Sequence, residues 1–214
     1  MTIREAFSLL YTIITDSQSL YYYMISKVEK VICSNTIFCV IAVLTIIRSS
    51  EIISAQNSDI ETLFQLINER LSYMKHVALY KDKTKTQIED IQREAVVIGD
   101  AVESANELGL YGPSVESFFR AQISVAKAIQ YRYRADWLST PPKFIPLDLQ
   151  QVIRPKLSEL GESIVKELAT FYLDGGQISD EHRNLFDDTI RIENISAQDK
   201  ARLFNSLRFI ATQR

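Results

Sequence analysis

From Gln56 to Arg93 the chain contains neither glycine nor proline, and its apolar residues recur there at helical spacing. The recurring positions are Leu63, Ile67, Leu71, Met74, Val77 and Ala78. Apolar residues three and four positions apart form one stripe along an α-helix. Because a stripe of this length must be covered by other elements, the segment predicts a long first helix inside a helical fold.

Glycine and proline divide the rest of the chain into further helices. We expect a loop at the polar segment 81–87, and a second helix from about residue 89 to 108 that Gly109 and Gly112 close. Pro113 suits the first turn of a third helix, which the prolines of "STPPKFIP" end after residue 138. The residues that this helix directs inward are Val115, Phe118, Phe119, Ile123, Ala126, Ile129, Tyr133 and Trp137.

A fourth helix is expected before the Gly175-Gly176 pair, and two shorter helices after it. The apolar stripe of the fourth helix is Leu157, Leu160, Ile164, Leu168 and Phe171. Ser179 and Ser196 are residues typical of N-caps and predict where the two shorter helices begin. No run of alternating β-branched residues bounded by turn residues predicts a strand. The fold class is therefore predicted as all-α, with one domain of about six helices.

Residues 24–55 have the order of an export signal. Lys27 and Lys30 form a basic start, residues 36–47 form an uninterrupted apolar core, and Ala55 is a small residue at a cleavable end. The apolar core is short for a membrane span. We therefore expect cleavage after Ala55, with no membrane association afterwards and with residues 1–23 as an upstream extension. The signal does not distinguish the periplasm from the outside of the cell.

Composition excludes several classes of function for the mature chain, residues 56–214. Both cysteines, Cys33 and Cys39, lie in the export segment, so the mature chain has neither a disulfide nor a thiolate metal site. The two histidines, His76 and His182, have no ligand spacing, and no phosphate loop or nucleophile elbow occurs. The formal net charge of −3 gives no general attraction for nucleic acid. We expect no metal, no cofactor and no nucleic-acid partner.

Two cations interrupt the apolar stripe of the first helix. Arg70 lies three residues after Ile67 and four before Met74, and Lys81 lies 11 residues beyond Arg70. Both side chains therefore point to the same side, about 16 Å apart along the axis and about 20° apart in rotation. A single basic side chain on such a stripe commonly extends along apolar surface to reach water.

More polar residues lie on the inner stripes of other helices. They are Gln122, Gln130, Arg154 and, on one face of the second helix, Asp90, Arg93 and Glu94. Buried cations without matching carboxylates are costly, and only two carboxylates are available in this set. The set therefore predicts a pocket for a small polyanion, with neutral hydrogen-bond donors and no nucleophile.

The segments "LFQLINERLSYMKHVALYK", "IEDIQRE" and "AQISVAKAIQYRYRADWL" resemble the exported, gamma-subclass AroQ-type chorismate mutases. The resemblance is strong over residues 60–138 and weak over 147–168. It implies an all-helical isomerase that converts chorismate to prephenate by a pericyclic rearrangement, in the biosynthesis of phenylalanine and tyrosine precursors. It also divides the mature chain into catalytic helices, 56–140, and a C-terminal helical part, 141–214, that provides Arg154.

The resemblance implies a role for each site residue. Arg70, Arg93 and Arg154, with help from Lys81, would bind the two carboxylates of the substrate. The two catalytic residues, Lys81 and Gln130, would donate hydrogen bonds to the ether oxygen whose bond to carbon breaks. The ring hydroxyl would be held by Glu94 and by the backbone near Asp90. Relatives in the family pair, so a homodimer is possible, although the exported subclass is able to complete each site within one chain.

The sequence departs from the family pattern at two positions. Ala126 stands where relatives often have a serine or threonine that contacts a carboxylate, so one contact is missing or taken by water. Gln130 stands where other members have a glutamate, which must be protonated before it can donate. Gln130 is a permanent donor, and we therefore expect activity that does not collapse as the pH rises through neutrality.

Three other functions compete with this interpretation. Isochorismate-pyruvate lyases of the same fold use a similar cationic pocket, and release of pyruvate from isochorismate would separate them from a mutase. A non-catalytic helical module could use the basic stripes to bind acidic groups of a partner, and it would tolerate loss of Lys81. A regulatory domain fused to aromatic biosynthesis is disfavoured, because no effector domain is evident in 214 residues and an export signal argues against feedback control.

Overall fold

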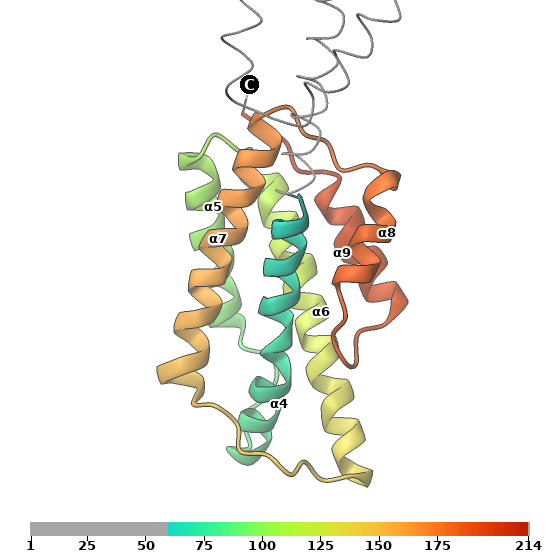
Figure 1. Ribbon diagram of the computed structural model, residues 1–214. Helices are drawn as coiled ribbons and strands as arrows, with labels where there is room; N and C mark the ends of the chain where they lie inside the picture. Colours follow the sequence, from blue (N-terminus) through green and yellow to red (C-terminus); the bar gives the residue numbers. More distant parts are fainter. Residues whose placement is uncertain (1–59, 214) are drawn as a thin grey trace, which may run out of the picture. The chain divides into compact units, whose positions relative to one another are not determined.

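The computed structural model describes residues 60–213, which form helices joined by loops (Figure 1). The predicted export signal, the cleavage site after Ala55 and both cysteines lie outside the described residues. Within the described part the all-α prediction is confirmed, because the only β-type contact there is an isolated bridge between Leu110 and Thr212. None of the helices in residues 60–213 has both the length and the apolar character needed to cross a membrane.

The long first helix is present with one irregularity. Residues 60–72 are helical, and the chain passes through a turn at Tyr73 into α4 (Met74–Lys83). Tyr73 keeps right-handed helical torsion angles, and its carbonyl accepts a hydrogen bond from the Val77 amide at 3.0 Å. The expected loop begins at Thr84 rather than at residue 81, so Lys81 still belongs to the helix.

Three further long helices follow the predicted order: α5 (Ile91–Glu107), α6 (Gly112–Ser139) and α7 (Arg154–Leu173). α5 begins slightly later than expected because Asp90 is its N-cap, with a carboxylate that accepts the Arg93 amide at 3.1 Å. α5 and α7 are followed by Gly109 and Gly175, which have φ of +84° and +83°. These left-handed conformations suit glycine and end the helices, as the sequence predicted.

The C-terminal helices are short and capped by the predicted serines. A π-helical turn, η1 (Leu149–Ile153), leads into α7, and a 3₁₀ turn, η2 (Asp180–His182), leads into α8 (Arg183–Thr189). The last helix is α9 (Ala197–Leu207). The Ser196 hydroxyl accepts the Asp199 amide at 3.1 Å, while the Ser179 amide donates to His182 Nδ1 at 3.1 Å.

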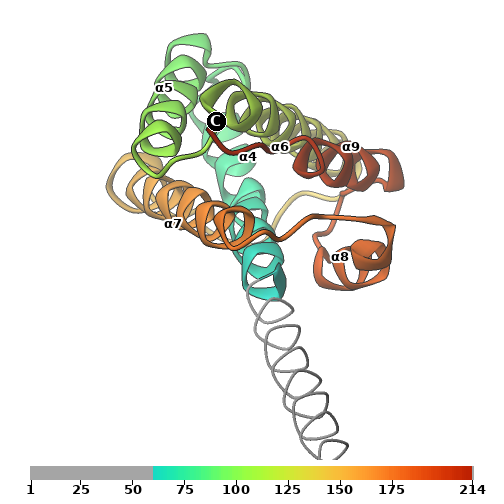
Figure 2. The ribbon, with the colours of Figure 1, turned by 90° about the horizontal axis from the view of Figure 1, so that it is seen from above.

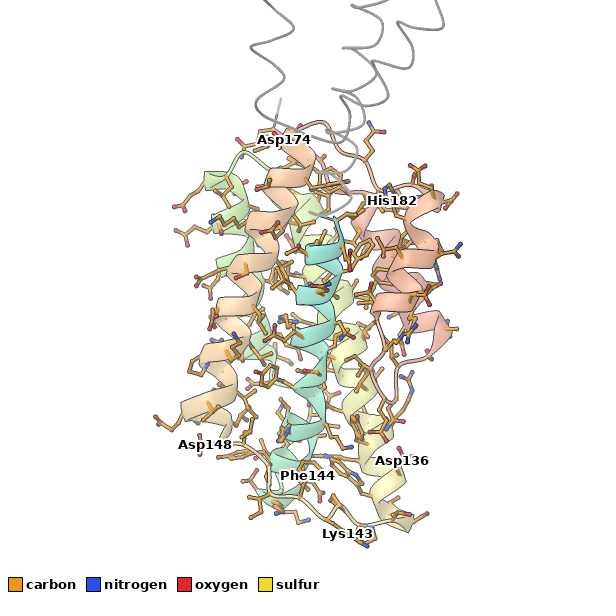
Figure 3. The ribbon with its side chains drawn as sticks, viewed as in Figure 1. Asp136, Lys143, Phe144, Asp148, Asp174 and His182 are labelled. Carbon is orange, nitrogen blue, oxygen red and sulfur yellow. The ribbon has the colours of Figure 1, made fainter. Side chains whose placement is uncertain are left out.

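The helices pack side by side around the first one. α4 lies between α6 and α7, and α5 packs on both α6 and α7 (Figures 1 and 2). α9 packs on the opposite side of α6, with α8 beside it (Figure 2). At the end where α4 stops, residues 140–148 cross to the start of α7 (Figure 1). There the Leu147 amide donates to His76 Nδ1 at 3.2 Å. Phe144, which Figure 3 shows at this end of the bundle, meets the His76 ring edge-on, with ring centroids 5.2 Å apart.

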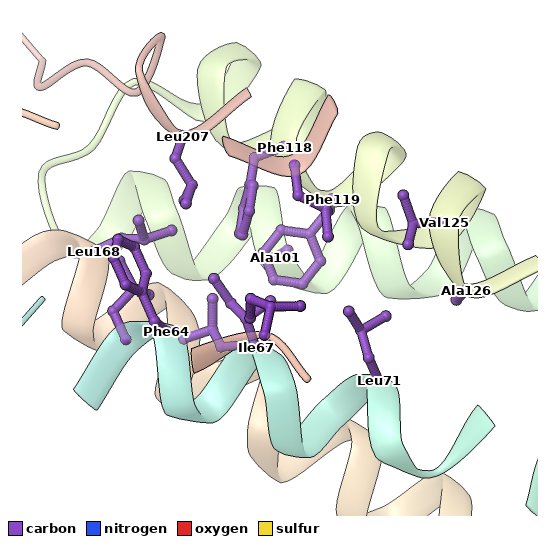
Figure 4. Packing of buried hydrophobic residues seen from close by; sticks show 14 of the residues in the cluster. Phe64, Ile67, Leu71, Ala101, Phe118, Phe119, Val125, Ala126, Leu168 and Leu207 are labelled. Atoms are coloured by element: carbon purple, nitrogen blue, oxygen red, sulfur yellow. The ribbon is translucent and has the colours of Figure 1, made fainter. Parts of the chain in front are cut away.

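The apolar core fills one part of this bundle. Phe64, Ile67 and Leu71 of the first helix face α6, where Phe118 and Phe119 project toward them (Figure 4). Phe64 also meets Phe186 of α8 edge-on, with ring centroids 5.0 Å apart. Phe186, Phe204 and Leu207 are fully buried, so the C-terminal segment completes the core.

Candidate active site

A pocket of about 120 Å³ lies between the long helices, toward the end where α4 stops and α7 begins. All seven predicted site residues line it, although they come from four separate stretches of the chain. The lining residues are Arg70, Met74, Val77, Lys81, Ile88, Asp90, Arg93, Glu94, Val97, Ile123, Ala126, Lys127, Gln130, Leu149, Arg154 and Leu157. Five cations against two carboxylates leave an excess of three positive charges.

Arg70 is the most deeply buried cation of the pocket. Arg70 is 5% exposed, and its Nη1 donates a hydrogen bond to Oε1 of the neutral Gln122 at 3.1 Å. Its Nε is buried without a partner, and no carboxylate among the described residues forms an ion pair with it. Burial, and then the positive charge of Arg93, lower the pKa of Arg70 to about 10. A buried guanidinium in this state attracts an anion.

Lys81 lies on the same face of the helix and is 7% exposed. Its Nζ donates to the Ile88 carbonyl at 2.6 Å, which ties the last turn of α4 to the later part of the loop that leads into α5. Burial lowers the pKa of Lys81, and the nearby carboxylates Asp90 and Glu94 offset part of this effect. A carbonyl satisfies one of the three ammonium protons, so Lys81 keeps donors for a ligand.

Asp90 and Arg154 form the wall of the pocket between α5 and α7. Arg154 Nη2 donates to Asp90 Oδ2 at 2.9 Å, and its Nη1 donates to Gln150 Oε1 at 3.1 Å. The other Asp90 oxygen caps α5, so one carboxylate both starts a helix and holds the arginine. Arg154 follows the π-helical turn directly, and such turns frequently occur at functional sites.

Arg93 and Glu94 lie in the first turn of α5. Arg93 Nη2 donates to the Ser158 hydroxyl of α7 at 3.0 Å. Glu94 Oε2 lies 3.0 Å from Lys127 Nζ, whereas its Oε1 accepts only a long contact of 3.4 Å from the Asp90 amide. One oxygen of Glu94 is therefore available as an acceptor.

Lys127 was not predicted as a site residue. It lies four residues after Ile123 and three before Gln130, which are both pocket residues, so the helical spacing of α6 places it on the same face. The spacing could therefore have identified Lys127 as a pocket residue from the sequence. Arg132 and Arg134 of the same helix do not line the pocket: Arg132 pairs with Asp199 at 2.6 Å, and Arg134 donates to the Thr86 carbonyl at 2.7 Å.

Gln130 is buried at the centre of the pocket face of α6. Its Nε2 donates to the Ala126 carbonyl at 3.1 Å and to Met74 Sδ at 3.4 Å. Its Oε1 is buried and has no partner. A buried oxygen without a hydrogen-bond donor costs stability, so Gln130 is not retained at this position for folding alone.

A larger and more open hollow of about 540 Å³ lies beside the C-terminal end of α6. Lys75 and Glu193 line it but are already joined by an ion pair of 2.8 Å, and Asp136 accepts a hydrogen bond from Asn194 at 2.7 Å. This hollow therefore lacks the unpaired charge that marks the smaller pocket as the candidate active site.

The lining of the charged pocket limits the chemistry available there. It contains no hydroxyl, thiol or imidazole side chain from the described residues. No cluster of three or more histidine, cysteine, aspartate or glutamate side chains in this part of the chain could hold a metal ion. What the pocket offers is a set of cationic and amide donors around a small space.

Comparison with known proteins assigns the part of the chain that forms the pocket to one family. The family model for chorismate mutase type II matches residues 59–131. The secreted chorismate mutase of Yersinia pestis is 43% identical over 142 residues, which cover 66% of this chain and 76% of that protein. The monofunctional chorismate mutase of Enterobacter agglomerans is 34% identical over 160 residues, covering 75% of this chain and 88% of that protein.

The similarity extends to three dimensions. The crystal structure of the secreted chorismate mutase from Yersinia pestis superimposes with a TM-score of 0.65 at 39% sequence identity. The superposition covers 71% of this chain and 97% of that chain.

Proposed function

This chain belongs to the chorismate mutase type II family and is an isomerase, and on that premise we propose that its charged pocket binds chorismate and converts it to prephenate. The reaction is an intramolecular pericyclic rearrangement, which needs neither a nucleophile nor a proton transfer. A pocket lined by donors and cations, without a hydroxyl, thiol or imidazole from the described residues, is consistent with that chemistry.

The charge excess around Arg70 supports this proposal most directly. Arg70 is buried with only a neutral hydrogen-bond partner, and the pocket carries three more positive than negative side chains. Chorismate has two carboxylates, so binding compensates most of this excess. Arg70, Arg93 and Arg154, with help from Lys81, are the side chains that we assign to the two carboxylates.

Lys81 and Gln130 are the donors that we assign to the ether oxygen. They line the pocket from different helices, α4 and α6. The Lys81 ammonium already has the required protonation at neutral pH. Gln130 would donate to the same oxygen through Nε2, which would give up its 3.4 Å contact with Met74 Sδ. Donors aimed at an oxygen that gains charge stabilise the transition state, each by about 3–4 kcal/mol.

Glu94 and the Asp90 amide are assigned to the ring hydroxyl. Glu94 Oε1 has only the long 3.4 Å contact with that amide, so the carboxylate oxygen and the amide N–H are both available to a bound hydroxyl. Catalysis then arises from holding the enolpyruvyl side chain over the ring and from oriented donors. All seven residues come from one chain, which supports a site completed without a partner subunit.

We further propose that residues 24–55 direct export and are removed after Ala55, leaving the enzyme in the periplasm or outside the cell. The secreted relative supports export but does not distinguish the two locations. A homodimer is part of the proposal and is tested by light scattering of the purified protein. The N-terminal sequence of the exported protein tests the cleavage site.

The activity is tested by following the loss of chorismate and the appearance of prephenate with the full chain. Arg70→Ala is expected to lower kcat/KM by about a hundredfold or more, because a charged hydrogen bond to a buried carboxylate is lost. Arg120→Ala is the matched control, since Arg120 is exposed and pairs only with Glu116. Arg154→Ala should also reduce turnover strongly.

Two results would contradict the proposal. A folded wild-type protein that leaves chorismate unchanged would be an anion-binding module. Release of pyruvate from isochorismate at a rate exceeding prephenate formation would identify a lyase of the same fold.

A further inference from the structure

Gln122 lies behind Arg70 and outside the lining of the pocket. It belongs to α6, is 0% exposed, and is one of the few fully buried polar side chains in the described part of the chain. Its Oε1 accepts the hydrogen bond from Arg70 Nη1 at 3.1 Å, across 52 residues of sequence. Its Nε2 is buried and has no partner.

This arrangement is unfavourable for stability alone. A buried amide with an unsatisfied N–H costs more than an apolar side chain of the same size. The aromatic ring of Phe119, 5.8 Å from Arg70 Cζ, already provides a favourable surface for the cation. What Gln122 adds is a directional acceptor that fixes one nitrogen of the guanidinium.

The neutrality of this acceptor is the important property. A carboxylate at the same position would form a buried ion pair with Arg70 and cancel its charge. A carboxamide fixes the orientation of the guanidinium and leaves its full positive charge directed into the pocket. The lowered pKa of Arg70 is consistent with a cation that has no compensating anion nearby.

We propose that Gln122 is a positioning residue for Arg70, and that its neutral acceptor keeps the charge of Arg70 available for a substrate carboxylate. The inference rests on the proposed function, in which Arg70 binds one carboxylate of chorismate. Because that carboxylate is present in both the substrate and the transition state, the contribution of Gln122 falls on binding and therefore on KM.

The test compares Gln122→Glu, Gln122→Leu and the control Gln177→Glu in the full chain. Gln177 is exposed, so its substitution makes the same change in net charge away from the pocket. Gln122→Glu is expected to raise KM for chorismate by about tenfold or more, with kcat changed less than about threefold. The thermal midpoint should stay equal or rise, since the new carboxylate pairs with Arg70. Gln122→Leu should raise KM by a smaller factor, because it releases Arg70 without cancelling its charge.

The binding of prephenate, measured as the shift in thermal midpoint that it produces, provides a readout independent of turnover. The shift should shrink for Gln122→Glu and persist for Gln177→Glu. If both Gln122 variants keep the wild-type KM, or lose only kcat in proportion to lost folded protein, Gln122 is merely structural and the inference is wrong. If Gln122→Glu does not fold, the KM-against-kcat split of Gln122→Leu decides. A folded wild-type protein that neither binds prephenate nor consumes chorismate would overturn the proposed function and this inference together.

Discussion

The two halves of the long first helix follow the same stripe but meet different surroundings. In the N-terminal half, Phe64 and Ile67 are fully buried against aromatic residues of α6 and α8. In the C-terminal half, Lys81 occupies the stripe, and the space opposite it is a pocket. Arg70 marks the boundary between the halves. One face of a single helix therefore contributes first to the apolar core and then to a charged pocket. Whether a given turn contributes to the core or to the pocket depends on whether its residues are apolar or cationic.

Substitutions in the N-terminal and C-terminal halves of this helix should have opposite effects on stability and activity. An apolar residue of the core half contributes to folding because its burial removes apolar surface from water. A cation of the pocket half costs folding free energy until an anion compensates it. Substitutions in the two halves should therefore separate the two properties.

Phe64→Ala should have the largest effect, and on stability. The side chain is fully buried, and its loss leaves a cavity beside Phe186, so the free energy of unfolding should fall by about 3–5 kcal/mol. Urea denaturation measures this change, and kcat/KM of the folded fraction should remain close to wild type. Phe209→Ala, at an exposed phenylalanine, is the control and should change stability little. A comparable loss of stability in the control would mean that the effect of Phe64→Ala does not report the burial of its side chain.

Lys81→Ala should have the reverse profile. We expect kcat to fall by about 10²–10³, which corresponds to the loss of one transition-state donor. The free energy of unfolding should fall by no more than about 1 kcal/mol, because removal of a buried cation offsets the lost packing. Lys83→Ala, two residues further along the same helix and exposed, should leave both quantities unchanged. Turnover retained in Lys81→Ala would mean that the ammonium is not catalytic.

Gln130→Glu should have the smallest effect of the three substitutions. At low pH its kcat should be close to that of the wild type, and the difference should grow as the pH rises. The wild-type profile should be flat through neutrality, since a carboxamide does not titrate. It should decline on the alkaline side, because the pKa of Lys81 is lowered from its usual value and the ammonium is lost earlier. The variant must hold a proton to donate, so its kcat should fall as the pH rises through neutrality. Rate profiles against pH measure the difference, and coinciding profiles would refute the role of Gln130.

The same pKa shifts predict how stability depends on pH. A lysine or arginine whose pKa is lowered by folding binds its proton less tightly in the native state, so the protonated form costs stability. This cost is present at neutral pH and is relieved as the pH rises through the lowered pKa values, about 10 for Arg70. An anionic ligand relieves it at neutral pH.

Much of the fold was predictable because its signals are local. The period of the first helix, the glycines after α5 and α7, Pro113 and the N-cap serines each act within a few residues. The errors were equally local: Asp90 is an N-cap rather than a residue inside α5, and the helix extends through Lys83 because backbone hydrogen bonds outweigh the polar composition there. Lys127 was missed although its spacing placed it on the pocket face.

The sequence by itself determined the helices, the stripes and the excess of cations on them, because periodicity and residue type are properties of short segments. Only the tertiary structure decided which partner each cation has. Gln122 meets Arg70 across 52 residues and Lys127 meets Glu94 across 33, and both contacts depend on how α6 packs against the other helices. The physical reason is that charge can be counted along a chain, whereas its compensation depends on distances that only packing fixes.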